Sequence, residues 1–161
     1  MTQERVSKEF AESYFGGDED NYDVVKHNRD HNKRYEASDG FNESWNQIWE
    51  TIADQTISSE EYAFLEQQVD INNLIDYILG NAYKGNLDGA TSWFFDWIRA
   101  NKWFGVKNRE GGGLKWTFFQ HDGEHTLGAR PSGAVGEFTV GPHAPFNDQT
   151  NQFYTKDYMN P

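Results

Sequence analysis

The sequence predicts an α+β fold for this chain, mostly helical with one β-hairpin. Segments 41–54 and 70–83 carry apolar residues at the three- and four-residue spacing of a helix. Farther along, the runs 102–107 and 114–119 have the aromatic content of strands, and the second run also alternates apolar and polar residues. The link NREGGG between them has the composition of a turn. We therefore expect a hairpin whose second strand leads directly into Asp122.

The first 35 residues predict short elements separated by turns and loops. Residues 1–12 are expected to begin as a strand and continue as a short helix, and residues 14–20 form a turn rich in glycine and acids. Residues 22–25 (YDVV) predict a short strand. The segment 26–35 (KHNRDHNKRY) is the only basic cluster, and we interpret it as a solvated loop.

Two helices are predicted between residues 41 and 69. The first has a single apolar face, which we interpret as a core stripe: Phe41, Trp45, Ile48, Trp49 and Ile52. The second begins at Ser58-Ser-Glu-Glu61, where a serine cap precedes acids in the first turn. Its apolar stripe consists of Tyr62, Leu65 and Val69.

The strongest helix signal covers residues 70–83 (DINNLIDYILGNAY). Asp70 is a suitable N-cap, and Gly85 is a suitable stop signal. The apolar face predicted for the core comprises Ile71, Leu74, Ile75, Ile78 and Ala82. Two polar residues of this helix, Asp76 and Asn81, are expected to be supporting or capping groups. A polar loop, Gly85-Asn-Leu-Asp88, follows, and residues 91–100 predict a short aromatic helical insertion.

Composition limits the classes of function. With 161 residues, the chain is long enough for one domain, and six Trp, eight Tyr and twelve Phe can form a core. A net charge of −12 argues against nucleic-acid binding, which needs a basic surface. The absence of cysteine excludes thiolate metal sites and disulfides. No apolar run is long enough to span a membrane, and the compartment is not determined.

The segment 119–127 (FQHDGEHTL) gathers two histidines and two acids, and three interpretations are open. His121-Asp-Gly-Glu-His125 formally fits the H-x-x-E-H zinc-peptidase signature, which requires a helix. Gly123 and the preceding strand disfavour a helix there. The other two interpretations are a polar turn and a site for a hard cation such as Mg²⁺, which prefers carboxylate oxygens.

Two acids follow buried elements in an order typical of kinases. Asp88 comes after the buried helix, as a catalytic-loop aspartate does, and Asp122 comes after a strand, as a metal-binding aspartate does. We expect the two carboxylates to meet around one divalent ion.

A series of motifs runs along nearly the whole chain: ERV and FAESYFGG near the N-terminus, YDVVK over residues 22–26, DINNLIDY over 70–77, NAYKGNLD over 81–88 and KWTFFQHDGEHTL over 115–127. In content and order, these motifs resemble those of the CotH kinase-like family of spore-coat and bacterial surface proteins. The last two are similar to the family's N-x-Y-x-G-N-x-D and K-(W/F)-x-F-F-x-W-D-x-E-H-T-(L/F) motifs.

The resemblance implies an atypical protein-kinase fold and a function. The chain is expected to be mostly the helical C-lobe of a domain that transfers phosphate from ATP, with Mg²⁺, to serine of a surface or coat protein. By the same resemblance, Asp88 is the catalytic residue, and Asp122 and Glu124 hold the metal. Asn86, Asn101 and Lys102 are the expected nucleotide-binding residues, although Lys102 stands where the family often has asparagine. His121 replaces the family's usual tryptophan.

The resemblance also leaves alternatives. Residues 1–161 match a partial domain, without the N-terminal lobe and the C-terminal end found in the family, so activity of this chain alone stays open. The alternative is a non-catalytic surface or spore-coat module with a structural divalent cation, for which an extracellular or spore-surface parent is expected by resemblance.

Overall fold

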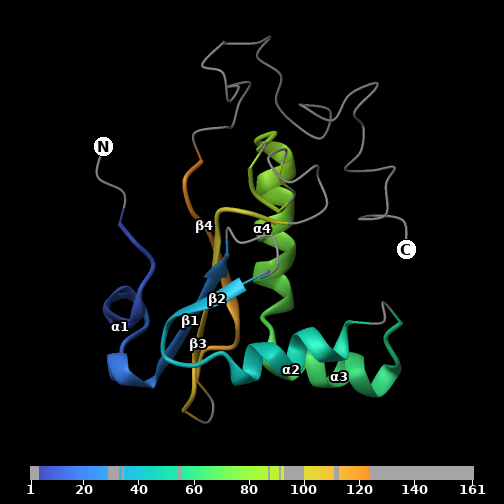
Figure 1. Cartoon of the computed structure of the whole chain (residues 1–161), viewed down its shortest axis with the longest axis horizontal. Helices are drawn as coiled ribbons and strands as arrows, with labels where there is room; N and C mark the ends of the chain where they lie inside the picture. The colour runs from blue at the N-terminus through green and yellow to red at the C-terminus, as the bar shows by residue number, and fades with distance from the viewer. Residues whose placement is uncertain are drawn as a thin grey trace. The chain divides into compact units, whose positions relative to one another are not determined.

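In the computed structural model, a helix and two strands are followed by three helices and then by two more strands (Figure 1). The structure describes residues 4–28, 33, 35–53, 56–86, 88–90, 92, 100–110 and 113–123. In chain order, its elements are α1 (Lys8–Phe15), the 3₁₀ turn η1 (Glu19–Asn21), β1 (Tyr22–His27), β2 (Tyr35–Asp39), α2 (Glu43–Thr51), α3 (Ser59–Gln68), α4 (Ile71–Tyr83), β3 (Trp103–Asn108) and β4 (Thr117–Gln120).

The chain divides into two compact units. Unit 1 comprises Met1–Leu74 and Phe104–Phe119, and unit 2 comprises Ile75–Trp103 and Gln120–Pro161. Helix α4 begins in unit 1 and continues into unit 2. Unit 1 therefore contains the sheet and the first three helices, whereas unit 2 contains most of α4 and the segments that carry the predicted site residues.

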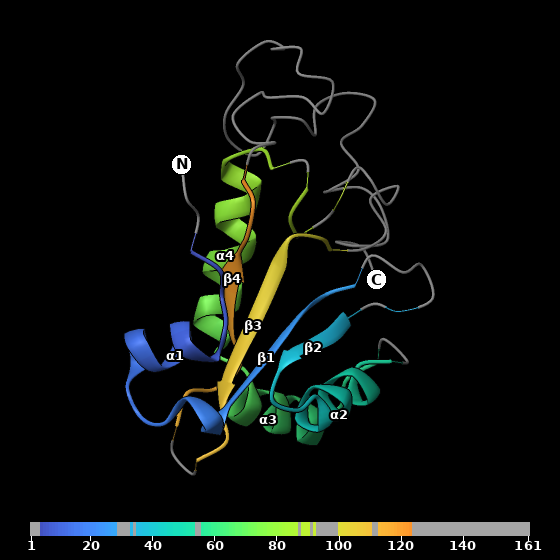
Figure 2. The ribbon, with the colours of Figure 1, turned by 60° about the vertical axis from the view of Figure 1, so that its left-hand side comes forward.

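A four-stranded antiparallel sheet, in the order β2-β1-β3-β4, organises unit 1 (Figure 2). In the register of β1 with β3, Val24 lies opposite Val106 and Val25 opposite Gly105. Strand β1 pairs with β2 on its other side, with an irregularity between Val24 and Val25. Strands β3 and β4 are neighbours in the sheet, which confirms the predicted hairpin and places Asp122 two residues beyond a strand.

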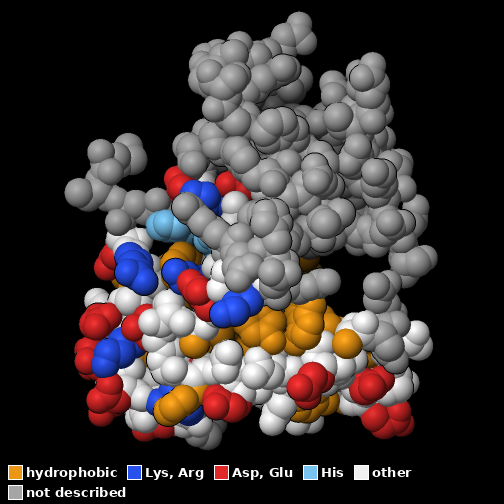
Figure 3. Space-filling view, viewed as in Figure 1, with side chains coloured by type: hydrophobic (Ala, Val, Ile, Leu, Met, Phe, Trp, Pro, Cys, Tyr) orange, Lys and Arg blue, Asp and Glu red, His pale blue; other side chains and the backbone are white. Residues whose placement is uncertain are grey.

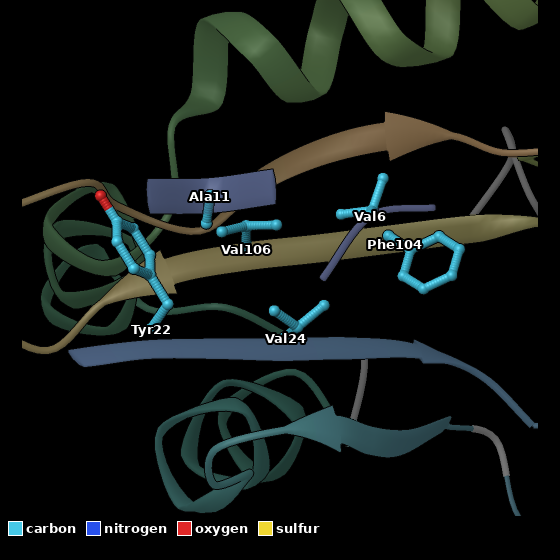
Figure 4. Packing of buried hydrophobic residues seen from close by; sticks show 6 residues of the cluster. All are labelled: Val6, Ala11, Tyr22, Val24, Phe104 and Val106. Atoms are coloured by element: carbon cyan, nitrogen blue, oxygen red, sulfur yellow. The ribbon is translucent and has the colours of Figure 1, made fainter. Parts of the chain in front are cut away.

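The core of unit 1 lies between α1 and the sheet. Figure 4 shows side chains from the N-terminal segment, α1, β1 and β3 converging there: Val6, Ala11, Tyr22, Val24, Phe104 and Val106. Val24, Val106 and Ala11 are completely buried. Removing a buried methyl or methylene from such a cluster costs about 1 kcal/mol or more. This apolar contact explains why α1 packs on β1.

A buried ion pair joins the sheet to the connection before α2. Asp23 on β1 is buried, pairs with Arg109 after β3, and accepts a hydrogen bond from the backbone nitrogen of Phe41 at 2.8 Å. The Arg109 guanidinium also lies 5.0 Å from the centre of the Phe41 ring. A buried carboxylate is tolerated when its charge and hydrogen bonds are both satisfied. The contacts of Asp23 therefore hold three parts of the chain together: β1, the residue Arg109 after β3, and the connection at Phe41 before α2.

The predicted helix starts at Ser58 and Asp70 are confirmed. Ser58 forms a capping box with Glu61: the Ser58 hydroxyl accepts from the Glu61 backbone nitrogen, and the Glu61 carboxylate accepts from that of Ser58. Asp70 accepts from the backbone nitrogen of Asn73 at 3.0 Å. Beyond α4, Gly85 has a φ of 59°, a left-handed conformation that glycine adopts readily.

Several expectations for the fold are wrong. The α+β class holds, but the described residues are not mostly helical, because β2 joins the predicted strand β1 and the predicted hairpin in a four-stranded sheet. Residues 35–39 form a strand that the sequence analysis did not predict. No strand is found within residues 4–7, and the helix starts at Lys8. The insertion predicted at 91–100 falls almost entirely outside the described residues.

Three residues expected in the core are exposed, by about half of their surface: Phe41, Tyr62 and Ile75. By contrast, Trp45 and Ile48 on α2 and Leu65 on α3, which belong to the same predicted stripes as Phe41 and Tyr62, are buried. An apolar stripe read from sequence is therefore wider than the face that packing covers.

No helix within the described ranges is long and apolar enough to cross a membrane. Figure 3 shows acidic and basic side chains next to one another on one face of the described surface, in a chain whose net charge is −12.

Candidate functional site

Asp88 is a buried carboxylate in unit 2, only 2 % exposed. Its Oδ1 atom accepts two hydrogen bonds, from Ser92 Oγ at 2.5 Å and from Asn101 Nδ2 at 2.7 Å. Among the described residues, none forms an ion pair with this carboxylate and none donates to its Oδ2 atom. Burying a negative charge is unfavourable without a compensating positive charge. Within the described part of the chain, the carboxylate is therefore held by two neutral hydrogen-bond donors.

A chain of amide hydrogen bonds connects Asp88 to helix α4. Asn81 Nδ2 donates to the Tyr77 carbonyl at 2.7 Å, and Asn81 Oδ1 accepts from Asn86 Nδ2 at 2.7 Å. Asn86 Oδ1 in turn accepts from the backbone nitrogen of Asp88 at 3.0 Å. Asn81 and Asn86 are both buried. Because buried amides are costly to leave unpaired, this chain fixes the backbone of Asp88 relative to the last turns of α4.

Gly89 allows these amides to pack closely. A Cβ atom at this position would overlap the side-chain amides of both Asn81 and Asn86. The carbonyl of Gly89 also accepts from the backbone nitrogen of Asn101 at 2.9 Å. Glycine is therefore required here by the proximity of two side chains.

Asn101, which donates a hydrogen bond to Asp88, carries a buried amide oxygen without a hydrogen-bond partner. The residue is 6 % exposed, and its Oδ1 atom is buried without a hydrogen-bond partner. A buried amide oxygen without a partner costs roughly 1–3 kcal/mol. Its own Nδ2 donates to Asp88, so the orphaned oxygen belongs to a side chain that already contacts the acid.

Asp122 lies two residues beyond β4, in a left-handed backbone conformation with φ of 58°. Its Oδ2 atom pairs with the Lys102 ammonium, and Lys102 is also left-handed, with φ of 51°. The backbone nitrogen of His121 donates to the Lys102 carbonyl at 2.8 Å. Non-glycine residues with positive φ are uncommon and cluster at functional sites.

The two acids are reached from consecutive residues. Asn101 contacts Asp88, and Lys102, the next residue, pairs with Asp122. Adjacent Cα atoms are only about 3.8 Å apart. The two acids are thus linked through one short segment of unit 2, and the expectation that their carboxylates meet around one ion stays a prediction.

A second lysine, Lys84, contacts Gln120, two residues before Asp122. Lys84, after α4, donates from Nζ to Oε1 of Gln120, the last residue of β4. Burial lowers the pKa of Lys84 below its ordinary value. Its ammonium is bonded to an uncharged amide, whereas the Lys102 ammonium is bonded to an acid.

Four of the residues singled out from the sequence form two separate contacts. Asp88 contacts Asn101, and Lys102 contacts Asp122. Asn86 also lies in this loop, but both ends of its amide bond to neighbours inside it, which favours a positioning role over contact with a nucleotide. Glu124 lies outside the described residues.

Two residues support Asp88 and its loop, and only one of them was expected from the sequence. Asn81 was expected as a supporting group on the helix, and its hydrogen bonds agree with that role. Ser92 was not singled out, although it is completely buried and bonds to Asp88. Its sequence neighbourhood, TSWFF, offers no signal for a polar contact eleven residues after the helix's last buried amide, Asn81.

The helical zinc motif does not fit the described part of its sequence. Residues 121–123 are not helical, and the φ of 58° at Asp122 is incompatible with a right-handed helix. Glu124 and His125 lie outside the described residues. Within the described ranges, no three His, Asp or Glu side chains gather around a common point.

The described residues also contain no group of three His, Asp or Glu side chains that could hold a hard cation such as Mg²⁺, which stays a prediction. Such an ion takes carboxylate and amide oxygens and fills its remaining positions with water or phosphate. The buried charge of Asp88 and the orphaned Oδ1 of Asn101 are donors of this kind. Asp122 supplies a third oxygen donor once its carboxylate is free of Lys102.

Comparisons of the chain with models of protein families, with curated proteins and with solved structures each find no match.

Proposed function

We propose that this chain is part of a kinase-like phosphotransferase of the CotH type, which moves the γ-phosphate of ATP to serine on a protein substrate. The observation that carries the proposal is the buried carboxylate of Asp88, which has no ion-pair partner among the described residues and accepts a hydrogen bond from Asn101, whose own Oδ1 atom is orphaned. The next residue, Lys102, pairs with a second acid, Asp122. The order of motifs along the sequence supports the same conclusion.

The elements follow the order of a kinase C-lobe. A long helix, α4, leads to a loop with the first acid, and a strand pair then leads to the second. In kinases this order places a catalytic aspartate and a metal-binding aspartate on opposite sides of the phosphate. The kinase-like identity of this lobe is part of the proposal.

Asp88 acts as the base in the proposed reaction. The serine hydroxyl oxygen attacks the γ-phosphorus, the bond from that phosphorus to the bridging oxygen breaks, and ADP leaves with the electron pair. The hydroxyl proton passes to Asp88 Oδ2, the oxygen to which no described residue donates. Ser92 and Asn101 hold Oδ1, so the carboxylate keeps a fixed orientation.

Asp122, Glu124 and the amide oxygen of Asn101 are the residues that would hold Mg²⁺. When bound, this ion would neutralise charge on the phosphates. Lys102 offers the positive charge nearest to Asp122 and is the proposed contact for a phosphate oxygen. Asn81 and Asn86 position the loop rather than touch the nucleotide.

The test is transfer of radiolabelled phosphate from ATP, with Mg²⁺ or Mn²⁺, to the chain itself or to a serine-containing protein. Asp88→Asn should lower the rate by at least about 100-fold, the usual contribution of a general base. Asp122→Asn should abolish the metal-dependent activity. Asp76→Asn removes an exposed acid of α4 and serves as the matched control, with unchanged activity.

Two outcomes would contradict the proposal. One is transfer that persists in both variants, which would place the chemistry elsewhere. The other is stabilisation by Ca²⁺ alone, with no response to ATP and no transfer, which would favour a structural cation in a non-catalytic surface module.

A further inference from the structure

We infer that Lys102 is a built-in competitor for the divalent cation: its ammonium occupies the carboxylate of Asp122, and a metal ion can bind there only after displacing it. This inference rests on the proposed function and concerns how its metal site is controlled. The ion pair is the central observation. The Lys102 side chain is 14 % exposed and that of Asp122 is 35 % exposed, so solvent screens the pair only in part.

The backbone maintains this contact. Lys102 and Asp122 both have left-handed φ values, and the hydrogen bond from the His121 nitrogen to the Lys102 carbonyl joins the two segments at 2.8 Å. A left-handed lysine or aspartate is unfavourable unless its surroundings stabilise it. The conformation of both residues is therefore specific, and it brings the ammonium to the acid.

Charge makes the competition direct. An ammonium and a divalent ion both need the same Oδ2 atom, and each repels the other at close range. Asp88 accepts a hydrogen bond from Asn101, the residue before Lys102, and lacks an ion-pair partner among the described residues. The cation is thus attracted toward Asp88 while Lys102 opposes it at Asp122, which makes the affinity depend on the position of one side chain.

The first test measures binding of Mn²⁺ and Mg²⁺ by calorimetry in the full chain. Lys102→Met removes the ammonium and keeps much of the side chain, so affinity should rise about tenfold. Lys102→Gly suits the left-handed backbone and should give the same direction of change. Lys84→Met is the matched control, because it removes an equal charge whose partner is the Gln120 amide, and it should change affinity much less.

Asp122→Asn distinguishes failure of the competition by Lys102 from failure of the proposed metal site. If the inference is correct, the gain from Lys102→Met disappears when Asp122 is also replaced. If wild-type chain binds Mn²⁺ through Asp122 but Lys102→Met binds equally or more weakly, the competition is refuted while the proposed function stands. If no variant shows binding that depends on Asp122, the proposed metal site fails as well.

A second measurement uses the unmodified chain. Acetylation of lysines by an N-hydroxysuccinimide ester, followed by mass spectrometry, reports how accessible each ammonium is. Saturating Mg²⁺ should increase labelling of Lys102 several-fold by releasing it from Asp122, and should leave Lys84 unchanged. Labelling of Lys102 that stays constant, under conditions where Mn²⁺ or Mg²⁺ binding is verified, would overturn the inference.

Discussion

The loop around Asp88 has no space for an additional side chain at residue 89. A Cβ atom there would overlap Asn81 and Asn86, whose amides carry the hydrogen bonds that position Asp88. We predict that Gly89→Ala lowers the free energy of unfolding by about 1–3 kcal/mol, as overpacking usually does. Chemical denaturation monitored by tryptophan fluorescence measures this.

Gly80→Ala is the control for that prediction. Gly80 lies within α4, and a Cβ added there meets nothing within 4 Å. Alanine in place of glycine inside a helix stabilises it by roughly 0.5–1 kcal/mol. Gly89→Ala should therefore lower the free energy of unfolding and Gly80→Ala should raise it. Equal changes in the two variants would contradict the close packing inferred around Gly89.

At this scale the sequence predicted some site residues and not others. Asp88 and Asp122 could be predicted because each follows a recognisable element, and Asn81 because it is a polar residue near the end of an apolar helix. Ser92 could not, since its contact with Asp88 depends on how the chain turns after α4. The pairing of Lys102 with Asp122 depends on two left-handed residues, which a local pattern does not reveal.

Among the elements, α2 and α3 offer a matched comparison of helix caps. Ser58 forms a complete capping box at the start of α3, whereas Asn42 at the start of α2 makes no side-chain capping bond. Ser58→Ala should therefore lower the free energy of unfolding by about 1 kcal/mol. Asn42→Ala should change it by less than about 0.5 kcal/mol.

Urea denaturation of the two variants checks this comparison, with the slope of the transition confirming that both unfold as the parent does. If Asn42→Ala lowered the free energy of unfolding as much as Ser58→Ala does, the capping bonds of Ser58 would not explain the difference between the two helix starts.

Helix signals in the sequence were more reliable than strand signals. Caps and apolar periodicity are local, so α2, α3 and α4 could be placed from them. Strand β2, Tyr35-Glu-Ala-Ser-Asp39, has few β-favouring residues, and it forms because β1 lies beside it. The exposed Phe41, Tyr62 and Ile75 show that periodicity marks a helix better than it marks the limits of its buried face.

Across the whole molecule, the excess of negative charge should influence stability. The net charge is −12, and like charges repel one another more strongly at low ionic strength. Raising NaCl from about 50 to about 500 mM should raise the melting temperature by about 2–4 °C, equivalent to roughly 1 kcal/mol. Differential scanning calorimetry measures this shift, and a decrease would mean that attractive ion pairs dominate.

The α+β class could be predicted, but the sheet order could not. Strand β1 pairs with β3, and these strands lie about 80 residues apart in the sequence. Local patterns contain no information on such a pairing. The contacts of the candidate site have the same property, because Asp122 pairs with Lys102, which lies 20 residues before it in the sequence.

The central claim is that Asp88 and Asp122 act on one magnesium and nucleotide cluster. The most direct measurement is the melting temperature with Mg²⁺ and ATP at constant ionic strength, for the unmodified chain, Asp88→Asn, Asp122→Asn and the double variant. At about 100 times the Kd, binding should raise the melting temperature by about 5 °C or more. We predict that Asp122→Asn removes most of this gain, that Asp88→Asn removes a smaller part of it by deleting a nearby negative charge, and that the double variant loses little more than Asp122→Asn. Full retention of the gain in Asp122→Asn, or an equal gain with Ca²⁺ in the absence of ATP, would contradict the account.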